Sequence, residues 1–292
     1  MVGDVMAWRW LRGHLGGNKT ARRTRGGAAV DPTKLLKMNA SELRALLADN
    51  PANAELWVRA AAERGLAAAQ VRLGRMMLEG IGLPKDEKLA LSWFKTAARA
   101  HDADAINMVG RCYENGWGAA PDSRIAVDWY RKAADAGHEW AQYNLGHMLL
   151  DGNGTAADPE EALFWYCKAA GQGHVRAMNL VARCHEEGWG VARNSAAARR
   201  WYRASAEGGY FRGQYNWATI LQGEGRFDEA EHWFRKAAAA GTPQVRRAIE
   251  RRSLVAIAKS CSTMNPLPSS PNLAREAARF SHGDESAIGS CS

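Results

Sequence analysis

Histidine and cysteine, the side chains best suited to metal and redox chemistry, recur along this chain at multiples of one interval. His138 and His174 are 36 residues apart, and Cys112 and Cys184 are 72 residues apart. A zinc site needs about four ligands, and no column of Cys, Asp or Glu completes one beside the histidines. We therefore interpret the histidines as helix-capping residues and the two cysteines as buried thiols, and we predict no metal and no cofactor.

Distance argues against a disulfide between Cys112 and Cys184. If stacked helical units are spaced at about 8–10 Å, these residues lie roughly 20 Å apart, whereas a disulfide needs Cα atoms within about 7 Å. Contact between Cys167 and Cys184, on neighbouring units, stays open. Five cysteines in 292 residues are too few for a disulfide scaffold, which favours a reducing compartment.

No catalytic motif is present. The chain lacks the G-x-x-x-x-G-K-[ST] phosphate loop, the H-E-x-x-H zinc motif and the G-x-S-x-G nucleophile motif. Glycine pairs of the type Gly80-x-Gly82 follow predicted helices rather than strands, so we interpret them as turns. We predict that the chain is not an enzyme and has no catalytic residues.

Tryptophan and glycine columns define an internal repeat of 36 residues, which is typical of stacked repeat architectures. One column holds Trp57, Trp93, Trp129, Trp165 and Trp201, and Trp233 follows after 32 residues. A second column holds Gly74, Gly110 and Gly146 and continues as Ala182 and Ala218. Within the repeat region, four further tryptophans lie outside the first column: Trp117, Trp140, Trp189 and Trp217.

Each unit is predicted to contain two antiparallel helices. In residues 139–151 apolar side chains recur at helical spacing, and Gly152 ends the helix because glycine accepts a positive φ. Asp158 then provides an N-cap for the second helix. The same cap position is predicted in the other units at Asp86, Asp122, Asn194 and Asp228.

Packing explains both repeat columns. A glycine in the middle of the first helix costs ~1 kcal/mol of helix propensity relative to alanine, but it lets the partner helix approach closely. We expect the tryptophan column to fill the space between successive helix pairs.

These features predict an all-α fold, because a single helix pair cannot bury its apolar face alone. We predict a right-handed superhelical solenoid of about five stacked antiparallel helix pairs. Its organisation is predicted as follows: a basic leader at 1–30, a helical cap at 31–61 with Ser41 as an N-cap, the repeat solenoid at 62–241, a capping helix at 242–260 and a disordered tail at 261–292.

The repeat motif points to a known family. The motif is Ala141-Gln142-Tyr143-Asn144-Leu145-Gly146, then Gly152-x-Gly154, then Ala162-x-x-Trp165-Tyr166-x-Lys168-Ala169-Ala170. It resembles the Sel-one-like repeat, a relative of the tetratricopeptide repeat, over about residues 55–241. The shorter loop at Gly223-Glu224-Gly225-Arg226 departs from the pattern. The resemblance implies an adaptor or scaffold for protein complexes, often in bacterial signalling or envelope regulation.

The first helices are predicted to line a polar and aromatic groove on the concave side. Next to the core positions they carry Arg75, Asn107, Arg111, Tyr143, His147, Asn179, Arg183 and Tyr215. Tyrosine and arginine are frequent anchors of recognition surfaces, and a guanidinium fork suits carboxylates. We therefore predict a groove for a protein or peptide partner that is acidic in part. The alternative is that the arginines only solvate an exposed helix face.

The net charge of +8 belongs to the ends of the chain. Residues 1–30 contribute +5 and residues 241–292 contribute +3, so residues 31–240 are neutral, with 26 groups of each sign. A neutral solenoid disfavours nucleic acid as its main partner. The leading hypothesis is a non-enzymatic protein-interaction scaffold. The second is a solenoid tethered to nucleic acid or an anionic membrane through its basic termini, with membrane contact through residues 1–25.

The sequence predicts a cytoplasmic location. Residues 1–16 include two tryptophans and two arginines but no apolar core of the ~7–15 residues that a secretory signal contains. No stretch approaches the ~18 apolar residues that a membrane span requires.

Overall fold

The computed structural model describes residues 51–247 and residue 249. Within them all regular secondary structure is helical, so the all-α prediction is confirmed. The chain divides into two compact units between Ala136 and Gly137. The predicted leader and tail, the Ser41 cap and most of the predicted capping helix lie outside the described residues; residues 243–247 are helical.

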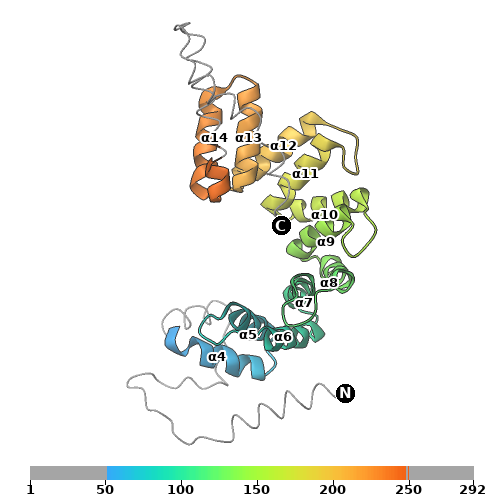
Figure 1. The fold of residues 1–292 in the computed structure, drawn as a ribbon, viewed down its shortest axis with the longest axis vertical. Coiled ribbons are helices and arrows are strands. Elements are labelled where there is room, and N and C mark those ends of the chain that lie inside the picture. Colours follow the sequence, from blue (N-terminus) through green and yellow to red (C-terminus); the bar gives the residue numbers. More distant parts are fainter. Residues whose placement is uncertain (1–50, 248, 250–292) are drawn as a thin grey trace, which may run out of the picture. The chain divides into compact units, whose positions relative to one another are not determined.

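The described part of the first unit contains five helices. They are α4 (Pro51–Glu63), α5 (Ala67–Glu79), α6 (Glu87–Arg99), α7 (Ala103–Asn115) and α8 (Ser123–Asp135). Helix α5 pairs with α6, and α7 pairs with α8 (Figure 1). The first helices of the two pairs, α5 and α7, also touch.

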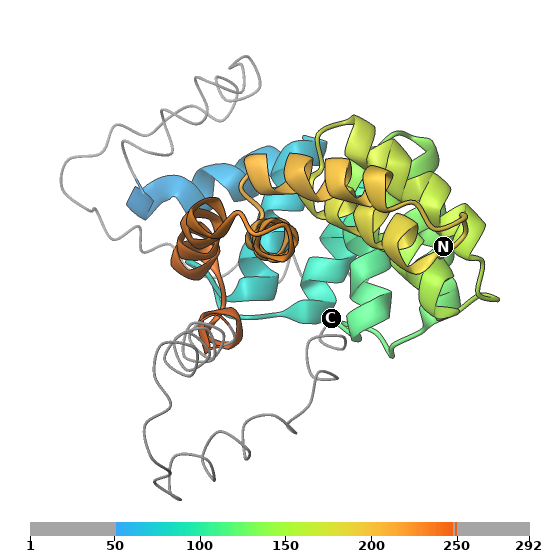
Figure 2. The ribbon, with the colours of Figure 1, turned by 90° about the horizontal axis from the view of Figure 1, so that it is seen from above.

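The second unit repeats this arrangement with six described helices. They are α9 (Glu139–Asp151), α10 (Pro159–Gly171), α11 (Val175–Glu187), α12 (Ser195–Glu207), α13 (Phe211–Gly223) and α14 (Phe227–Ala240). Consecutive helices pair as α9 with α10, α11 with α12, and α13 with α14 (Figures 1 and 2). Helices α11 and α13 are also in contact.

Side-chain caps start most of the second helices where the sequence predicts them. The carboxylates of Asp86, Asp122 and Asp158 accept backbone N–H bonds at the starts of α6, α8 and α10. Asn194 caps α12 through Ala197 N at 2.9 Å. The prediction for Asp228 is wrong: the shorter loop starts α14 at Phe227, so Asp228 lies inside the first turn.

In two of the G-x-G turns the second glycine has two reasons to be glycine. Gly118 has a φ of +77°, and Gly190 has a φ of +68°, which disfavours side chains. A Cβ on Gly118 would also collide with the backbone of Glu87, at the start of α6. A Cβ on Gly190 would collide with the backbone of Pro159, at the start of α10. These turns therefore pack directly against the preceding repeat.

The small column of the first helices allows close approach of the partner helix, as predicted, and the side chains that it meets are aromatic. A Cβ on Gly110 would lie 2.8 Å from the ring of Tyr130, and one on Gly146 would lie 2.5 Å from the ring of Tyr166. The buried column is therefore the residue that follows each repeat tryptophan: Phe94, Tyr130, Tyr166, Tyr202 and Phe234.

The repeat tryptophans are more peripheral than expected. Trp93, Trp129, Trp201 and Trp233 are only half-buried, and Trp165 is buried. Lysine ammonium groups lie over two of these rings, Lys132 at 4.8 Å from the Trp129 centroid and Lys236 at 4.5 Å from that of Trp233. These two tryptophans are therefore partly exposed, and each ring makes a cation–π contact with a lysine.

The described cysteines are free thiols. Cys112 and Cys184 are fully buried, as predicted, and burial raises the pKa of both, to about 12 and about 11. Cys167 is exposed and close enough to Cys184 to raise its pKa further.

Candidate functional site

The predicted groove positions of the first unit bind groups of the protein itself. Arg75 Nη2 lies 2.6 Å and 2.9 Å from the two carboxylate oxygens of Asp104, which belongs to the next repeat. Both side chains are half-exposed, so the pair contributes at most about 1 kcal/mol. Its main effect is to neutralise Arg75.

Two asparagines predicted to face a partner are instead buried. Asn107 is 4% exposed and Asn179 is 5% exposed. The Oδ1 atom of Asn179 accepts a hydrogen bond from Asn216 Nδ2 at 2.9 Å. A buried amide must satisfy its polar atoms internally, so neither side chain is presented to a partner, and Asn179 links α11 to α13.

Among the described residues, each of the four tryptophans outside the repeat column has an arginine over its ring. The Cζ atom of Arg111 is 5.2 Å from the ring centroid of Trp117, and that of Arg183 is 4.8 Å from the centroid of Trp189. The other two pairs are Arg176 over Trp140 at 5.2 Å and Arg199 over Trp217 at 5.4 Å. Each contact contributes about 0.5–1 kcal/mol at an exposed site and fixes the direction of the guanidinium.

Aromatic rings surround the groove positions of α9. The Tyr143 ring lies 4.6 Å from that of His147 and 4.9 Å from that of His174. The His147 ring lies 5.6 Å from that of Tyr166. Burial lowers the pKa of His147, an effect opposed by Asp151 and reinforced by the charges of Arg183 and Arg212. His147 is therefore a neutral member of an aromatic cluster at pH 7.

The Tyr166 hydroxyl is buried without a hydrogen-bond partner. In two other repeats the equivalent hydroxyl donates to a glutamate sixteen residues earlier: Tyr130 to Glu114, and Tyr202 to Glu186 at 2.5 Å. The corresponding position before Tyr166 holds Leu150. The unpaired hydroxyl could therefore have been predicted from the sequence, because a leucine replaces the glutamate in this one repeat.

His138 and His174 are helix caps, as predicted. Their Nδ1 atoms accept hydrogen bonds from Ala141 N at 3.2 Å and Ala177 N at 3.1 Å. Burial, aided by the charges of Arg176 and His138, lowers the pKa of His174 to about 4. His174 is thus neutral at pH 7, with its proton on Nε2, and that atom is buried without a partner.

Tyr215 occupies the last predicted groove position. Its ring lies 5.6 Å from that of Phe234, and its backbone carbonyl accepts a hydrogen bond from Thr219 Oγ1 at 3.0 Å. The side chain is half-buried against the core of the last helix pair.

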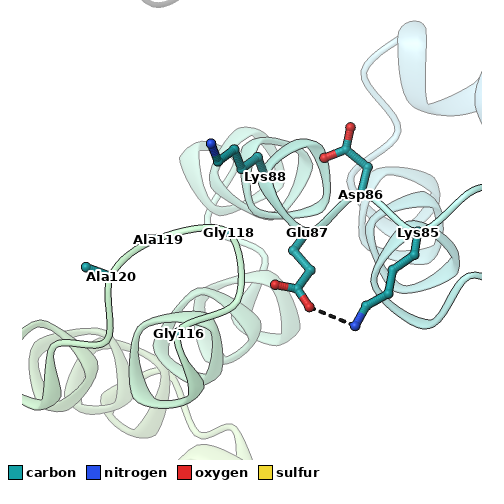
Figure 3. A pocket seen from close by; sticks show the side chains of 8 residues that line it. All are labelled: Lys85, Asp86, Glu87, Lys88, Gly116, Gly118, Ala119 and Ala120. Carbon is teal, nitrogen blue, oxygen red and sulfur yellow. Dashed lines mark ion pairs between the residues drawn. The ribbon is translucent and has the colours of Figure 1, made fainter.

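A shallow cavity of about 560 Å³ lies in the first unit, where the turn after α7 meets the start of α6 (Figure 3). Lys85 Nζ is 2.8 Å from Glu87 Oε1, and this contact lowers the pKa of Glu87. The remaining lining residues are Asp86, Lys88, Gly116, Gly118, Ala119 and Ala120. No nucleophile paired with a base stands among them.

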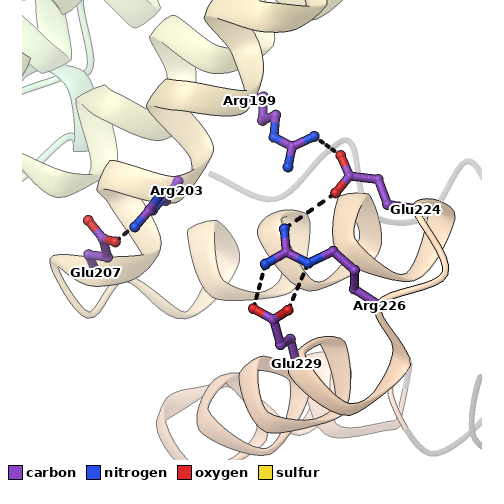
Figure 4. Close-up of polar contacts among 6 residues, drawn as sticks. All are labelled: Arg199, Arg203, Glu207, Glu224, Arg226 and Glu229. Carbon is purple, nitrogen blue, oxygen red and sulfur yellow. Dashed lines mark hydrogen bonds and ion pairs between the residues drawn. The ribbon is translucent and has the colours of Figure 1, made fainter.

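A second cavity, of about 310 Å³, lies in the second unit beside α12 and is rich in arginine. Most of its cations are matched by carboxylates (Figure 4). Arg226 binds Glu229 through two hydrogen bonds of 2.7 Å and 2.6 Å, and Arg199 and Arg226 both pair with Glu224. This cluster therefore has little unpaired charge for a ligand.

The part of the chain that the structure describes, residues 51–247 and 249, shows neither a metal-binding group nor a membrane-spanning helix. No group of three His, Cys, Asp or Glu side chains in this part could hold a metal ion. No helix of the same part has the length and apolar character to cross a bilayer.

Stacked pairs of short antiparallel helices place the chain in the class of tetratricopeptide-like α-solenoid repeats. The Sel1 repeat model matches residues 67–102, 103–138, 141–174, 175–210 and 212–242. The chain therefore belongs to the Sel1 repeat family, as the resemblance predicted. Members of this family are generally non-catalytic scaffolds for protein–protein interactions.

Solved structures of similar proteins agree with this assignment. A Sel1 repeat protein from Oxalobacter formigenes is 28% identical with a TM-score of 0.63, over 71% of this chain and 86% of that one. A protective antigen of uropathogenic Escherichia coli strains, with an SLR fold, is 32% identical with a TM-score of 0.57, over 64% of this chain. The match spans only 41% of the antigen's chain. No curated protein matches the sequence.

Proposed function

We propose that this protein is a non-enzymatic scaffold that binds a protein or peptide partner through the first helices of its repeats. The observation that carries the proposal is the repeated arginine–tryptophan pair. Arg111 on Trp117 and Arg183 on Trp189 occupy equivalent positions 72 residues apart, one in each unit. Tryptophan and arginine are enriched among the residues that dominate binding energy at protein interfaces.

Packing supports the same proposal. The small residues of the first helices and the buried aromatic column are used for internal packing. The half-exposed and exposed positions, including Arg111, Tyr143 and Arg183, are left at the surface. An array of this kind varies its surface residues without changing its core, which suits a binding scaffold.

Charge reversal of the two stacked arginines tests the proposal. The full chain, carrying an affinity tag, is used to capture partners, with and without Arg111→Glu and Arg183→Glu together. We expect at least a tenfold loss of captured partner, measured by quantitative mass spectrometry, with an unchanged circular dichroism spectrum. Arg72→Glu is the control, because Arg72 is an exposed helix residue of the first unit. Equal capture by all three chains would contradict the proposed surface.

A further inference from the structure

Five side chains of the second unit form a group of aromatic and cation–π contacts around one arginine. Trp140 and Tyr143 come from α9, His174 and Arg176 from the start of α11, and Tyr210 from the residue before α13. We call these five residues the Arg176 cluster. The His174 ring lies 4.4 Å from that of Trp140 and 4.9 Å from that of Tyr143. Three helix starts of successive repeats therefore converge on one place.

Arg176 is an exposed cation that contacts two aromatic rings. Its Cζ atom is 5.2 Å from the Trp140 ring centroid and 5.8 Å from the Tyr210 ring centroid. Burial raises the pKa of Tyr143, and a hydrogen bond from Arg176 to Tyr143 opposes that rise. Contacts on several sides hold the guanidinium in one orientation, which reduces the entropy lost when it binds a ligand.

Arg176 differs from Arg75, Arg199 and Arg226 in its electrostatic surroundings. Arg75 has Asp104, and Arg199 and Arg226 share Glu224. Within the described residues Arg176 forms no ion pair. A bidentate carboxylate is the natural complement of such a guanidinium.

A buried donor of the same cluster, two residues before Arg176, supports a ligand site. His174 is 5% exposed, and its Nε2 atom has no hydrogen-bond partner. Because Nδ1 accepts the bond from Ala177 N, the ring proton lies on Nε2, which is therefore a donor. Leaving a buried donor unpaired carries a free-energy cost. A ligand oxygen that accepts this hydrogen bond would recover part of that cost.

The surrounding charge favours an anion. The positive charge of Arg212 lowers the pKa of Tyr143, His147 and Tyr210. The positive charge of Arg183 lowers the pKa of His147 and Tyr166. The negative charge of Asp151 opposes the arginines, because it raises the pKa of His147 and of Tyr166. The arginines come from two helices, so their field extends along more than one repeat. This spread suits a segment with several carboxylates better than a single terminal carboxylate.

We propose that the Arg176 cluster binds an acidic side chain of an extended partner segment, with the carboxylate on the guanidinium of Arg176 and the neutral Nε2–H of His174 as a second donor. Trp140 and Tyr210 flank the guanidinium and contact the aliphatic part of the same segment. The inference rests on the proposed scaffold function and names the chemistry that one site of it recognises.

A defined peptide probe tests the inference on the full chain. The probe is a fluorescein-labelled decapeptide of alternating Glu and Ala with an amidated C-terminus, and its binding is followed by fluorescence anisotropy. We expect the Kd to rise at least tenfold with Arg176→Gln. We expect a smaller rise with His174→Asn, which keeps a capping side chain but removes the Nε2–H. Arg72→Gln, the same charge change in the first unit, should leave the Kd unchanged.

Matched peptides distinguish the sources of the carboxylate. The same peptide with Gln in place of Glu should bind at least tenfold more weakly. Binding of the Gln peptide restored by a free C-terminus would show that the site reads chain ends, which overturns the proposal. Equal effects of Arg176→Gln and Arg72→Gln, or no Glu-dependent binding up to about 1 mM, would overturn it as well.

The two proposals fail separately. If capture depends on Arg111 and Arg183 but Arg176→Gln leaves the Kd of the Glu peptide unchanged, the scaffold function stands and the carboxylate site is wrong. If the peptide binds at Arg176 while capture is insensitive to Arg111 and Arg183, the carboxylate site stands and the arginine–tryptophan surface is wrong.

Discussion

The α7–α8 pair and the α9–α10 pair have the same packing and different polar chemistry. In both pairs a tyrosine lies over a glycine of the first helix, Tyr130 on Gly110 and Tyr166 on Gly146. Tyr130 has a glutamate partner, whereas the Tyr166 hydroxyl has none. Arg75 in the first unit binds a carboxylate of α7, whereas Arg176 in the second has aromatic neighbours instead. The comparison separates what the repeat needs to fold from what each repeat can vary.

The largest expected effect tests the tyrosine–glycine packing that the two helix pairs share. Gly110→Val and Gly146→Val should each destabilise the chain by about 3 kcal/mol, because the new side chain meets a fully buried ring that cannot move. Urea unfolding of the full chain measures the loss. Gly171→Val is the control, since nothing lies within 4 Å of a Cβ there. Markedly unequal losses at the two glycines would show that the two pairs do not share one packing.

The next effect concerns pH and the buried donor of the second unit. The pKa of His174 is about 4 in the folded chain and about 6.5 when unfolded. The unfolded state therefore binds more protons between these values, so stability falls as pH decreases from about 6.5 to about 4, by about 2.5 kcal/mol.

Replacing His174 should remove that dependence. His174→Asn keeps a capping side chain, and its stability should change less than that of the wild type over the same pH interval. His138→Asn, at the equivalent cap of α9, is the matched control and should keep most of the wild-type slope, because burial is the largest cause of the low His174 pKa and the charge of His138 a smaller one. Urea unfolding at pH 7, 5.5 and 4.5 measures both. A wild-type slope in His174→Asn would assign the pH dependence to other groups.

The smallest effect compares the two tyrosine hydroxyls directly. Tyr130→Phe removes a hydrogen bond to Glu114 and should cost about 1 kcal/mol of unfolding free energy. Tyr166→Phe removes an unpaired buried hydroxyl and should be neutral or stabilising by up to about 1 kcal/mol. Thermal unfolding of both variants measures the difference. Equal destabilisation would mean that Tyr166 has a partner, and the contrast between the pairs would fail.

Periodic residues allowed most of the fold to be predicted from the sequence. The glycine turns, the caps at Asp86 and Asp158 and the small column were predictable because each repeats with one local physical cause. The start of α14 was mispredicted because the period shortens before it. The buried aromatic column was assigned one residue too early, since adjacent aromatics such as Trp165 and Tyr166 share the same period.

The candidate site was less predictable, because it depends on departures from the repeat. Arg75 and Asn107 occupy predicted groove positions, but one meets Asp104 and the other is buried, and both outcomes depend on neighbouring repeats. Trp140 was noticed only as an extra tryptophan. Its contact with Arg176, and that of Arg176 with Tyr210, join three helix starts that no local pattern connects.

The close turn at Gly118 has a consequence for how such chains grow. Because this turn meets the backbone of α6 through main-chain atoms, the junction between two repeats demands little of the side chains around it. A duplicated unit that keeps the glycine therefore keeps this main-chain contact with its neighbour. The array can lengthen in single steps while its surface residues diverge independently.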